Sequence, residues 1–172
     1  DGGDDDDDGG GGGDDDAWRS PSQLPELRRL YLGSNPGLGD AGVGALAAAL
    51  SRPGVCPMLE VLDLSGCGVG PAGCRALARV LRRHPSLREL DLGRNPAIGS
   101  QGAEVIARAL SASRRLATLD LRGCGVGDGG AAAIGTALTK GRSAASTVVA
   151  VSAGRGGRSS SSSSSTHCST PR

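Results

Sequence analysis

Three aspartates recur at one position of a repeated string of residues. Asp63, Asp91 and Asp120 stand in LEVLDLSGC, LRELDLGRN and LATLDLRGC, each between two leucines. If these strings are adjacent parallel strands, aligned residues on neighbouring strands lie about 4.8 Å apart. Carboxylates at that spacing could act as a general acid and base, or could hold a divalent cation.

Nearby basic residues favour another interpretation of these carboxylates. Arg29, Arg88 and Arg122 stand close enough in the repeat to neutralise them. No residue is placed to stabilise an electrophile, and an open sheet excludes no water, whereas active sites are usually enclosed. We therefore expect an exposed, charged interaction surface and no enzyme active site.

Three glycine-rich segments match the G-x-G-x-x-G pattern of dinucleotide-binding turns: GLGDAG (37–42), GVGPAG (68–73) and GVGDGG (125–130). Asp63 also follows Gly42 by 21 residues, near the place of a ribose-binding acid. A nucleotide-binding fold needs this fingerprint once, whereas here it recurs. The preceding strings alternate leucine with charged residues, unlike strands buried on both faces. We predict strand-to-helix turns, no nucleotide and no other cofactor.

The cysteines and histidines do not form a recognisable site. The five cysteines are Cys56, Cys67, Cys74, Cys124 and Cys168. They are odd in number and contain no CxxC pair, so neither a disulfide framework nor a zinc site is indicated. The two histidines, His84 and His167, have no visible scaffold that would join them to a cysteine. We expect reduced thiols and no metal.

An arginine-rich helix is predicted over residues 71–83. Its arginines lie away from the apolar face and could meet phosphate, but no aromatic residues are interleaved to stack on bases. Nucleic-acid binding is therefore unsupported, and a solvated outer helix is the favoured interpretation. The arginines are Arg75, Arg79, Arg82 and Arg83.

The strings that carry the aspartates are four copies of one pattern. The copies begin at Leu27, Leu59, Leu87 and Leu116, which are 32, 28 and 29 residues apart, with leucine at the first, fourth and sixth positions. The two-residue period predicts a strand with one buried face and two outward columns of side chains. One column is Tyr31, Asp63, Asp91 and Asp120, and the other is Arg29, Val61, Glu89 and Thr118.

A helix is predicted after each strand. Four segments align without a gap from Gly39, Gly70, Gly99 and Gly127, and small or apolar residues recur at i, i+3, i+4 and i+7, which is one helix face. The predicted inward residues are Val43, Leu46, Ala47 and Leu50; Cys74, Leu77, Ala78 and Leu81; Ala103, Ile106, Ala107 and Leu110; Ala131, Ile134, Gly135 and Leu138. Asp40, Ser100 and Asp128 occupy expected N-cap positions, and Pro71 suits a first helical turn.

One strand and one helix cannot bury their apolar faces alone, so the four units must stack into an α/β solenoid. The chain contains no Phe, one Trp and one Tyr, so its core must be aliphatic. Small residues on the helices let them approach the sheet closely. The fold class is therefore predicted from periodicity rather than from any catalytic motif.

The repeated pattern L-x-x-L-x-L-x-x-N/C resembles leucine-rich repeats of the ribonuclease-inhibitor type, which are also found in the sensor arms of NOD-like receptors and in the Ran GTPase-activating protein. The resemblance covers roughly residues 24–142 and includes an alternation of Asn35, Cys67, Asn95 and Cys124. It implies a short right-handed β/α horseshoe with a parallel concave sheet and convex helices. The Asn and Cys positions are expected to fill the turn after each strand, where an inward amide satisfies backbone groups. The chain departs from the family in an SRPGVCPM insertion before Leu59 and in a glycine-rich last helix.

The domain organisation follows from these repeats and from two low-complexity ends. We predict a disordered Asp/Gly tail at 1–16, a lead-in at 17–26, four repeats over 27–142, a degraded end strand at 143–154 and a disordered Ser-rich tail at 155–172. The repeats are bounded as 27–58, 59–86, 87–115 and 116–142. In the end strand, Ala145, Val148 and Ala150 are expected at the first, fourth and sixth positions.

Charge is segregated along the chain. Nine of the 18 acidic residues lie in residues 1–16, which leaves 19 basic and nine acidic residues in the rest. The acidic run could attract a basic partner or the Arg-rich repeats, although a solvated tail is the favoured interpretation. No apolar run reaches the ~18 residues of a membrane span and no signal sequence opens the chain. We expect no membrane association and a cytoplasmic location, with the nucleus as an alternative. Because the first residue is Asp rather than Met, the natural N-terminus is expected to be missing.

The leading functional prediction is a non-catalytic protein-binding module with a partner on the concave face. Tyr31 is the favoured anchor because it is the only aromatic residue there. The predicted contact residues are Arg29, Tyr31, Glu60, Asp63, Glu89, Asp91, Thr118 and Asp120. The resemblance leaves two alternatives: a regulator of a small GTPase, and the sensor arm of a NOD-like receptor, although no GxxxxGK[ST] motif of a nucleotide-binding domain occurs in the chain.

Overall fold

A computed structural model describes residues 24, 26–113, 115–140 and 148–151. Strands and helices alternate along this part of the chain, as the repeat predicts. The elements are β1 (Arg29–Tyr31), α1 (Gly39–Leu50), β2 (Val61–Asp63), α2 (Pro71–Arg83), β3 (Glu89–Asp91), a 3₁₀ helix η2 (Pro96–Ile98), α3 (Gly99–Ala112), β4 (Thr118–Leu121), α4 (Gly127–Lys140) and β5 (Val148–Val151). The predicted tails 1–16 and 155–172 lie outside the described residues.

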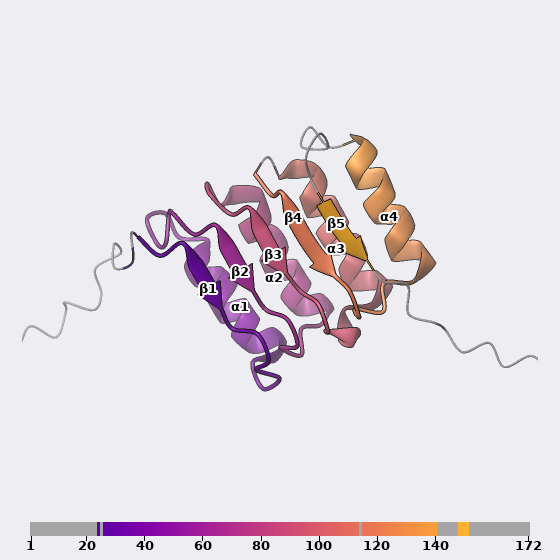
Figure 1. Cartoon of the computed structure of the whole chain (residues 1–172), viewed down its shortest axis with the longest axis horizontal. Coiled ribbons are helices and arrows are strands. Elements are labelled where there is room, and N and C mark those ends of the chain that lie inside the picture. The colour runs from indigo at the N-terminus through magenta and orange to yellow at the C-terminus, as the bar shows by residue number, and fades with distance from the viewer. Residues whose placement is uncertain (1–23, 25, 114, 141–147, 152–172) are drawn as a thin grey trace, which may run out of the picture.

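The strands form one parallel sheet in sequence order, β1-β2-β3-β4-β5. The helices α1 to α4 all lie on one face of this sheet and leave the other face open (Figure 1). The fold is therefore the predicted leucine-rich repeat solenoid, with the sheet as the concave layer and the helices as the convex layer.

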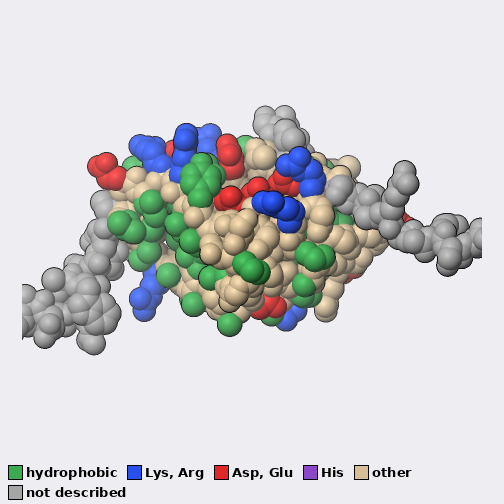
Figure 2. Space-filling view, turned by 60° about the horizontal axis from the view of Figure 1, so that its bottom comes forward, with side chains coloured by type: hydrophobic (Ala, Val, Ile, Leu, Met, Phe, Trp, Pro, Cys, Tyr) green, Lys and Arg blue, Asp and Glu red, His purple; other side chains and the backbone are tan. Residues whose placement is uncertain are grey.

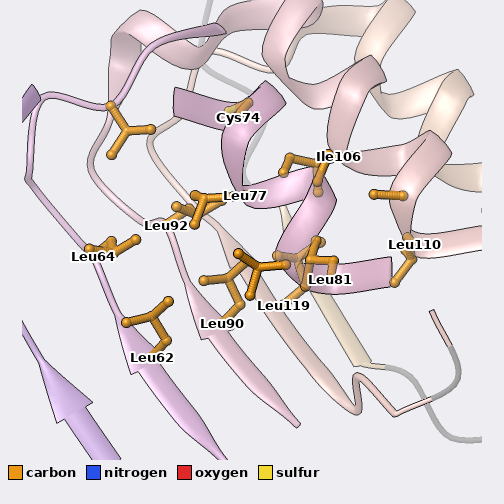
Figure 3. Packing of buried hydrophobic residues seen from close by; sticks show 14 of the residues in the cluster. Leu62, Leu64, Cys74, Leu77, Leu81, Leu90, Leu92, Ile106, Leu110 and Leu119 are labelled. Atoms are coloured by element: carbon orange, nitrogen blue, oxygen red, sulfur yellow. The ribbon is translucent and has the colours of Figure 1, made fainter. Parts of the chain in front are cut away.

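The core consists of the repeated leucines and the inward faces of the helices. Leu59, Leu62 and Leu64 are fully buried, and the matching leucines of the next two units are at most 3% exposed. In Figure 3 the leucines of β2, β3 and β4 point toward Cys74, Leu77 and Leu81 of α2 and toward Ile106 and Leu110 of α3. No single unit could bury these residues, so the hydrophobic stabilisation belongs to the stack.

Both ends of the stack depart from this pattern. In the first unit, Leu30 and Leu32 are only partly buried, because β1 is the edge strand of the described sheet. In α4, Ala131 and Gly135 are exposed although the helix periodicity predicts them to face inward. The buried face of α4 consists of Gly130, Ile134 and Ala137. Ala131 and Gly135 stay exposed because α4 packs on α3 and no described helix covers its opposite side.

The last strand forms one residue later than predicted. β5 pairs with β4 so that Val149 lies beside Leu119 and Val151 beside Leu121. The expected positions had Val148 and Ala150 facing inward, so that alignment was wrong; Ala145 lies outside the described residues. This register packs the partly buried Val149 against the core beside Leu119, whereas Val151 at the end of the described strand stays exposed.

Adjacent units are joined through the ninth residue of each string. The thiol of Cys67 donates to the carbonyl of Leu32 at 3.0 Å, the amide of Asn95 donates to Leu64 at 2.9 Å, and the thiol of Cys124 donates to Leu92 at 3.0 Å. In every case the acceptor belongs to the sixth position of the preceding unit. The side chains at these positions therefore tie each turn to the unit before it.

Asn95 makes additional hydrogen bonds that a cysteine cannot make. Its Oδ1 accepts from the backbone N–H groups of Cys67 at 2.9 Å and Val69 at 3.0 Å, while its Nδ2 also donates to Leu92 and Gly93. The residue is fully buried. Asn35 occupies the same position in the first unit, but it is exposed and its amide donates only to Leu32 and Gly33.

The residue expected to cap α1 caps the next helix instead. Asp40 Oδ1 accepts from the N–H groups of Gly70 at 2.6 Å and Gly73 at 2.8 Å, at the start of α2. Ser100 likewise donates to the carbonyl of Val126 in the following unit at 2.6 Å. The N-cap predictions for Asp40 and Ser100 were therefore wrong, because their helices begin one residue earlier and these side chains reach the next unit; Pro71 does begin its helix, as predicted.

This contact also explains one of the repeated glycines. A Cβ at Gly73 would lie 2.7 Å from Asp40 Oδ1 and 2.9 Å from Val69. A side chain there would displace the carboxylate that caps α2. The glycine therefore serves packing between units, which was the structural interpretation of the G-x-G-x-x-G segments.

We predict that Asn95→Ala lowers the free energy of unfolding by about 3 kcal/mol or more, because two buried N–H groups and a buried carbonyl lose their partner. Asn35→Ala, the matched change at an exposed copy of the position, should cost less than ~1 kcal/mol. Urea unfolding followed by circular dichroism would measure both. Equal losses would show that the bridge between units is not the source of the effect.

A second prediction concerns Asp40. Asp40→Ala should lower the free energy of unfolding by about 1 kcal/mol, since it removes a charged acceptor from the start of α2. Asp128→Ala is the control, because Asp128 is aligned with Asp40 in the last described helix, where no following helix is described. If the two substitutions destabilise the chain equally, capping across units makes no contribution.

Candidate protein-binding face

The outward residues of the strands form the two predicted columns. Tyr31, Asp63, Asp91 and Asp120 are aligned partners on successive strands, and so are Arg29, Val61, Glu89 and Thr118. β5 extends the first column with Ala150, the aligned partner of Asp120. The strand register thus places seven of the eight predicted contact residues in two parallel columns on the open face of the sheet. Glu60, the eighth, lies just before β2, where its Oε1 accepts from Arg28 Nη1 at 2.9 Å.

Exposure differs strongly along the first column. Tyr31 has 63% of its surface exposed at the edge strand. The three aspartates are only partly exposed. Within this column the Tyr31 ring is therefore the most solvent-exposed side chain, and the three carboxylates are partly covered by their neighbours.

Each aspartate also holds the turn that follows its own strand. Asp63 Oδ1 accepts from the N–H of Ser65 at 2.8 Å, and Asp91 Oδ1 accepts from Gly93 at 2.7 Å. Asp120 makes the same contact with the N–H of Arg122 at 2.8 Å. One oxygen of each carboxylate is thus used locally, a structural role that the sequence interpretation missed and that an Asp two residues before a small or turn residue could have indicated.

Arginines convert the acidic column into a mixed-charge surface. Arg122 Nε donates to both carboxylate oxygens of Asp120, at 3.1 and 2.8 Å. Arg94 Nη2 approaches Ser65 Oγ at 3.5 Å. In Figure 2 acidic side chains gather in the middle of this face with basic ones on both sides. Of the three arginines expected to neutralise the column, only Arg122 forms an ion pair with one of its aspartates among the described residues; Arg29 and Arg88 do not.

The sequence did not identify Arg94 as part of the face. It occupies the eighth position of its string, where all four units adopt a left-handed backbone, with φ of 57° at Arg94. The other residues there are Ser34, Gly66 and Gly123. Such a turn favours glycine, so an arginine there has a conformational cost. The Arg94 side chain lines the hollow at the strand ends.

These residues enclose a shallow hollow of about 300 Å³ at the strand ends. It is lined by Ser65, Asp91, Gly93, Arg94, Asp120 and Arg122. Burial raises the pKa of Asp91, and the charges of Asp120 and Asp63 add to the increase, while the Gly93 N–H and Arg122 oppose it. The hydrogen bonds from Arg122 hold the pKa of Asp120 below its usual value.

Other groups that could carry chemistry are differently placed. Cys56, Cys67, Cys74 and Cys124 are buried thiols outside any disulfide, and burial raises the pKa of Cys74 to about 12. Among the residues that the structure describes, no cluster of three or more histidine, cysteine or acidic side chains could hold a metal ion. No described helix is long and apolar enough to cross a membrane.

A stacked β/α solenoid with one open sheet face defines this chain as a repeat protein of the leucine-rich class. Its sequence matches the family model described as "Leucine Rich repeat" four times, over residues 23–47, 55–78, 83–107 and 113–135. These matches cover more than half of the chain. The protein belongs to the leucine-rich repeat family, and its repeats are of the ribonuclease-inhibitor type.

Three relatives illustrate the similarity. Ribonuclease inhibitor of Sus scrofa is 44% identical over 104 residues, which are 60% of this chain and 22% of that protein. Tonsoku-like protein of Bos taurus is 42% identical over 106 residues, 60% of this chain and 7% of that protein. NACHT, LRR and PYD domains-containing protein 13 of Homo sapiens is 38% identical over 102 residues, 59% of this chain and 9% of that protein. The chain thus spans less than a quarter of the length of these relatives.

The coupling between the carboxylates generates a prediction. Asp120→Asn should lower the pKa of Asp91, because it removes a neighbouring negative charge and releases Arg122 to interact with Asp91. Asp63→Asn should lower it less, since Arg122 stays on Asp120. A titration of the carboxyl ¹³C resonances would measure the pKa of Asp91 in each protein. An unchanged or higher value in Asp120→Asn would contradict the proposed coupling.

Proposed function

We propose that this chain is a non-catalytic protein-interaction module that binds a protein partner on its concave face. The observation that carries the proposal is the strand register, which aligns the outward side chains of β1 to β4 in two columns on an uncovered sheet. The proposed contact residues are Arg29, Tyr31, Glu60, Asp63, Glu89, Asp91, Thr118 and Asp120. Solenoids of this kind present extended surfaces of this type to partners.

The chemistry of the face suggests how binding energy is distributed. Tyr31 is the anchor, because a largely exposed aromatic ring can bury much area with little loss of side-chain entropy. The exposed Arg29 and Glu89 contribute mainly to selectivity and to the rate of encounter. Asp91 and Asp120 are already held by hydrogen bonds, so a partner meets a pre-organised surface.

The relatives favour a binding role. The name of ribonuclease inhibitor describes a protein that inhibits an enzyme, which is an action on another protein. The similarity to NACHT, LRR and PYD domains-containing proteins 12 and 13 supports a second candidate, the sensor arm of a NOD-like receptor. In both cases the described repeats would act by binding.

Structure-based variants can test the proposed face. Arginine substitutions at the three aspartates would also break turn hydrogen bonds. We therefore choose Tyr31→Ala, Arg29→Glu and Glu89→Arg, whose side chains are exposed and make no hydrogen bond within the described part of the chain. The control is Arg75→Glu with Arg79→Glu on the exposed side of α2. Circular dichroism would first establish that all proteins are folded.

We expect affinity capture from a cell lysate, read by quantitative mass spectrometry, to retain a partner with the wild type and the α2 control. The triple variant should lose it, and with the purified partner its dissociation constant should rise at least about tenfold. Retention by all three proteins would place binding elsewhere. Stimulated GTP hydrolysis by a captured small GTPase would overturn the non-catalytic reading in favour of a GTPase regulator.

A further inference from the structure

A second pocket lies at the opposite edge of the sheet from the hollow at the strand ends. It lies between the loop from α1 to β2 and the end of α2. Figure 1 shows that these segments meet at the edge of the sheet where the strands begin. Its volume is about 420 Å³. Its lining residues are Leu50, Ser51, Arg52, Pro53, Gly54, Val55, Pro57, Arg83, His84 and Pro85.

The insertion in the first unit builds one wall of this pocket. The first two strings begin 32 residues apart, compared with 28 and 29 for the next ones. The extra residues form a loop whose backbone is fixed by left-handed residues at Gly54 (φ 82°) and Cys56 (φ 48°). Arg52 N donates to Ala49, and the Cys56 side chain is buried. A ligand would therefore meet a preformed wall, with little loop entropy to lose.

The pocket combines an apolar floor with a cationic rim. Leu50 and His84 are the buried lining residues, and the partly buried Val55 and Pro57 extend the apolar surface beside Leu50. Arg52 and Arg83 are exposed at the rim. No acidic residue lines the pocket, and neither arginine forms an ion pair within the described part of the chain. Two guanidinium groups without a carboxylate partner, beside an apolar surface, are complementary to a carboxylate with an adjoining apolar group.

The C-terminal ends of α1 and α2 determine which groups of the pocket can bind a carboxylate. α1 and α2 both end here, and helix C-termini carry partial negative charge, so the backbone does not attract an anion. Arg82 and Arg83 in the last turn of α2 offset that charge. A bound carboxylate would therefore pair with the guanidinium groups at the rim rather than enter the floor.

We propose that this pocket, between the inserted loop and the end of α2, binds an acidic peptide segment of a partner protein in which glutamate or aspartate alternates with an apolar residue. The acidic side chains pair with Arg52 and Arg83, and the apolar side chain lies against Leu50 and Val55. This site is separate from the concave face. The chain's own residues 1–16 match the charge but contain only Asp and Gly, so they offer nothing to the floor.

Fluorescence anisotropy with short labelled peptides tests the proposal on the full chain. The probe has the sequence Glu-Leu-Glu-Leu between blocked glycines, and the controls are Glu-Ser-Glu-Ser and Lys-Leu-Lys-Leu. The variant is Arg52→Glu with Arg83→Glu. The matched control, Arg75→Glu with Arg79→Glu, makes the same charge change on exposed positions of α2 that do not line the pocket.

The wild type should bind Glu-Leu-Glu-Leu with a dissociation constant below about 1 mM. The pocket variant should bind at least about tenfold more weakly, and the α2 control should bind within about twofold of the wild type. Both control peptides should bind more weakly to the wild type. Thermal unfolding of each protein would verify that the variants are folded.

Three results would overturn the proposal. Equal weakening in both variants would mean that general positive charge attracts the peptide, and equal binding of Glu-Ser-Glu-Ser would mean that the floor is not used. Absence of binding to the wild type would also reject it. If binding then emerged after removal of residues 1–16, the occupant would be the chain's own acidic segment instead of a partner. None of these results bears on the concave face, so the two proposals fail separately.

Discussion

The buried amide of Asn95 links two units of the stack through their backbones. It accepts from two N–H groups of the preceding unit and donates to carbonyls on both sides of the junction. These groups emerge from the ends of the strands, where sheet pairing stops. An unpaired amide in a fully buried position would be costly, so the hydrogen bonds favour one alignment of the two units. The alignment of the outward columns, and with it the whole concave face, depends on that junction.

The sequence predicted those features that depend on period within a unit. Leucines at the first, fourth and sixth positions identify the strands, and the residues that alternate with them identify both outward columns. The fold class and the buried faces of α1 to α3 followed in the same way. These features are local, because a strand or helix face is determined by residues a few positions apart.

What the sequence could not predict is the contact between units. Asp40 was assigned to its own helix but caps the next one, because a local pattern contains no information about which neighbour a side chain reaches. The register of β5 was wrong by one residue for a similar reason: the choice depends on what Val149 can bury against β4. Tertiary packing also decided that Gly130 and Ala137, rather than Ala131 and Gly135, face the interior of α4. The turn role of Asp63 and the contribution of Arg94 to the face depend on the same three-dimensional placement.

Contacts between units have a direction and alternate in kind, which limits how such a chain can grow or shrink. Asp40 accepts a hydrogen bond from the unit that follows it, whereas Asn95 accepts one from the unit that precedes it. That preceding unit has cysteine, Cys67, at its ninth position. Duplication or deletion of a single repeat would bring two units of the same kind together and leave one side of the junction without its complement. A change of two consecutive repeats preserves every junction. Length variation in this architecture, whether by gene duplication or by design, should therefore proceed in pairs of repeats.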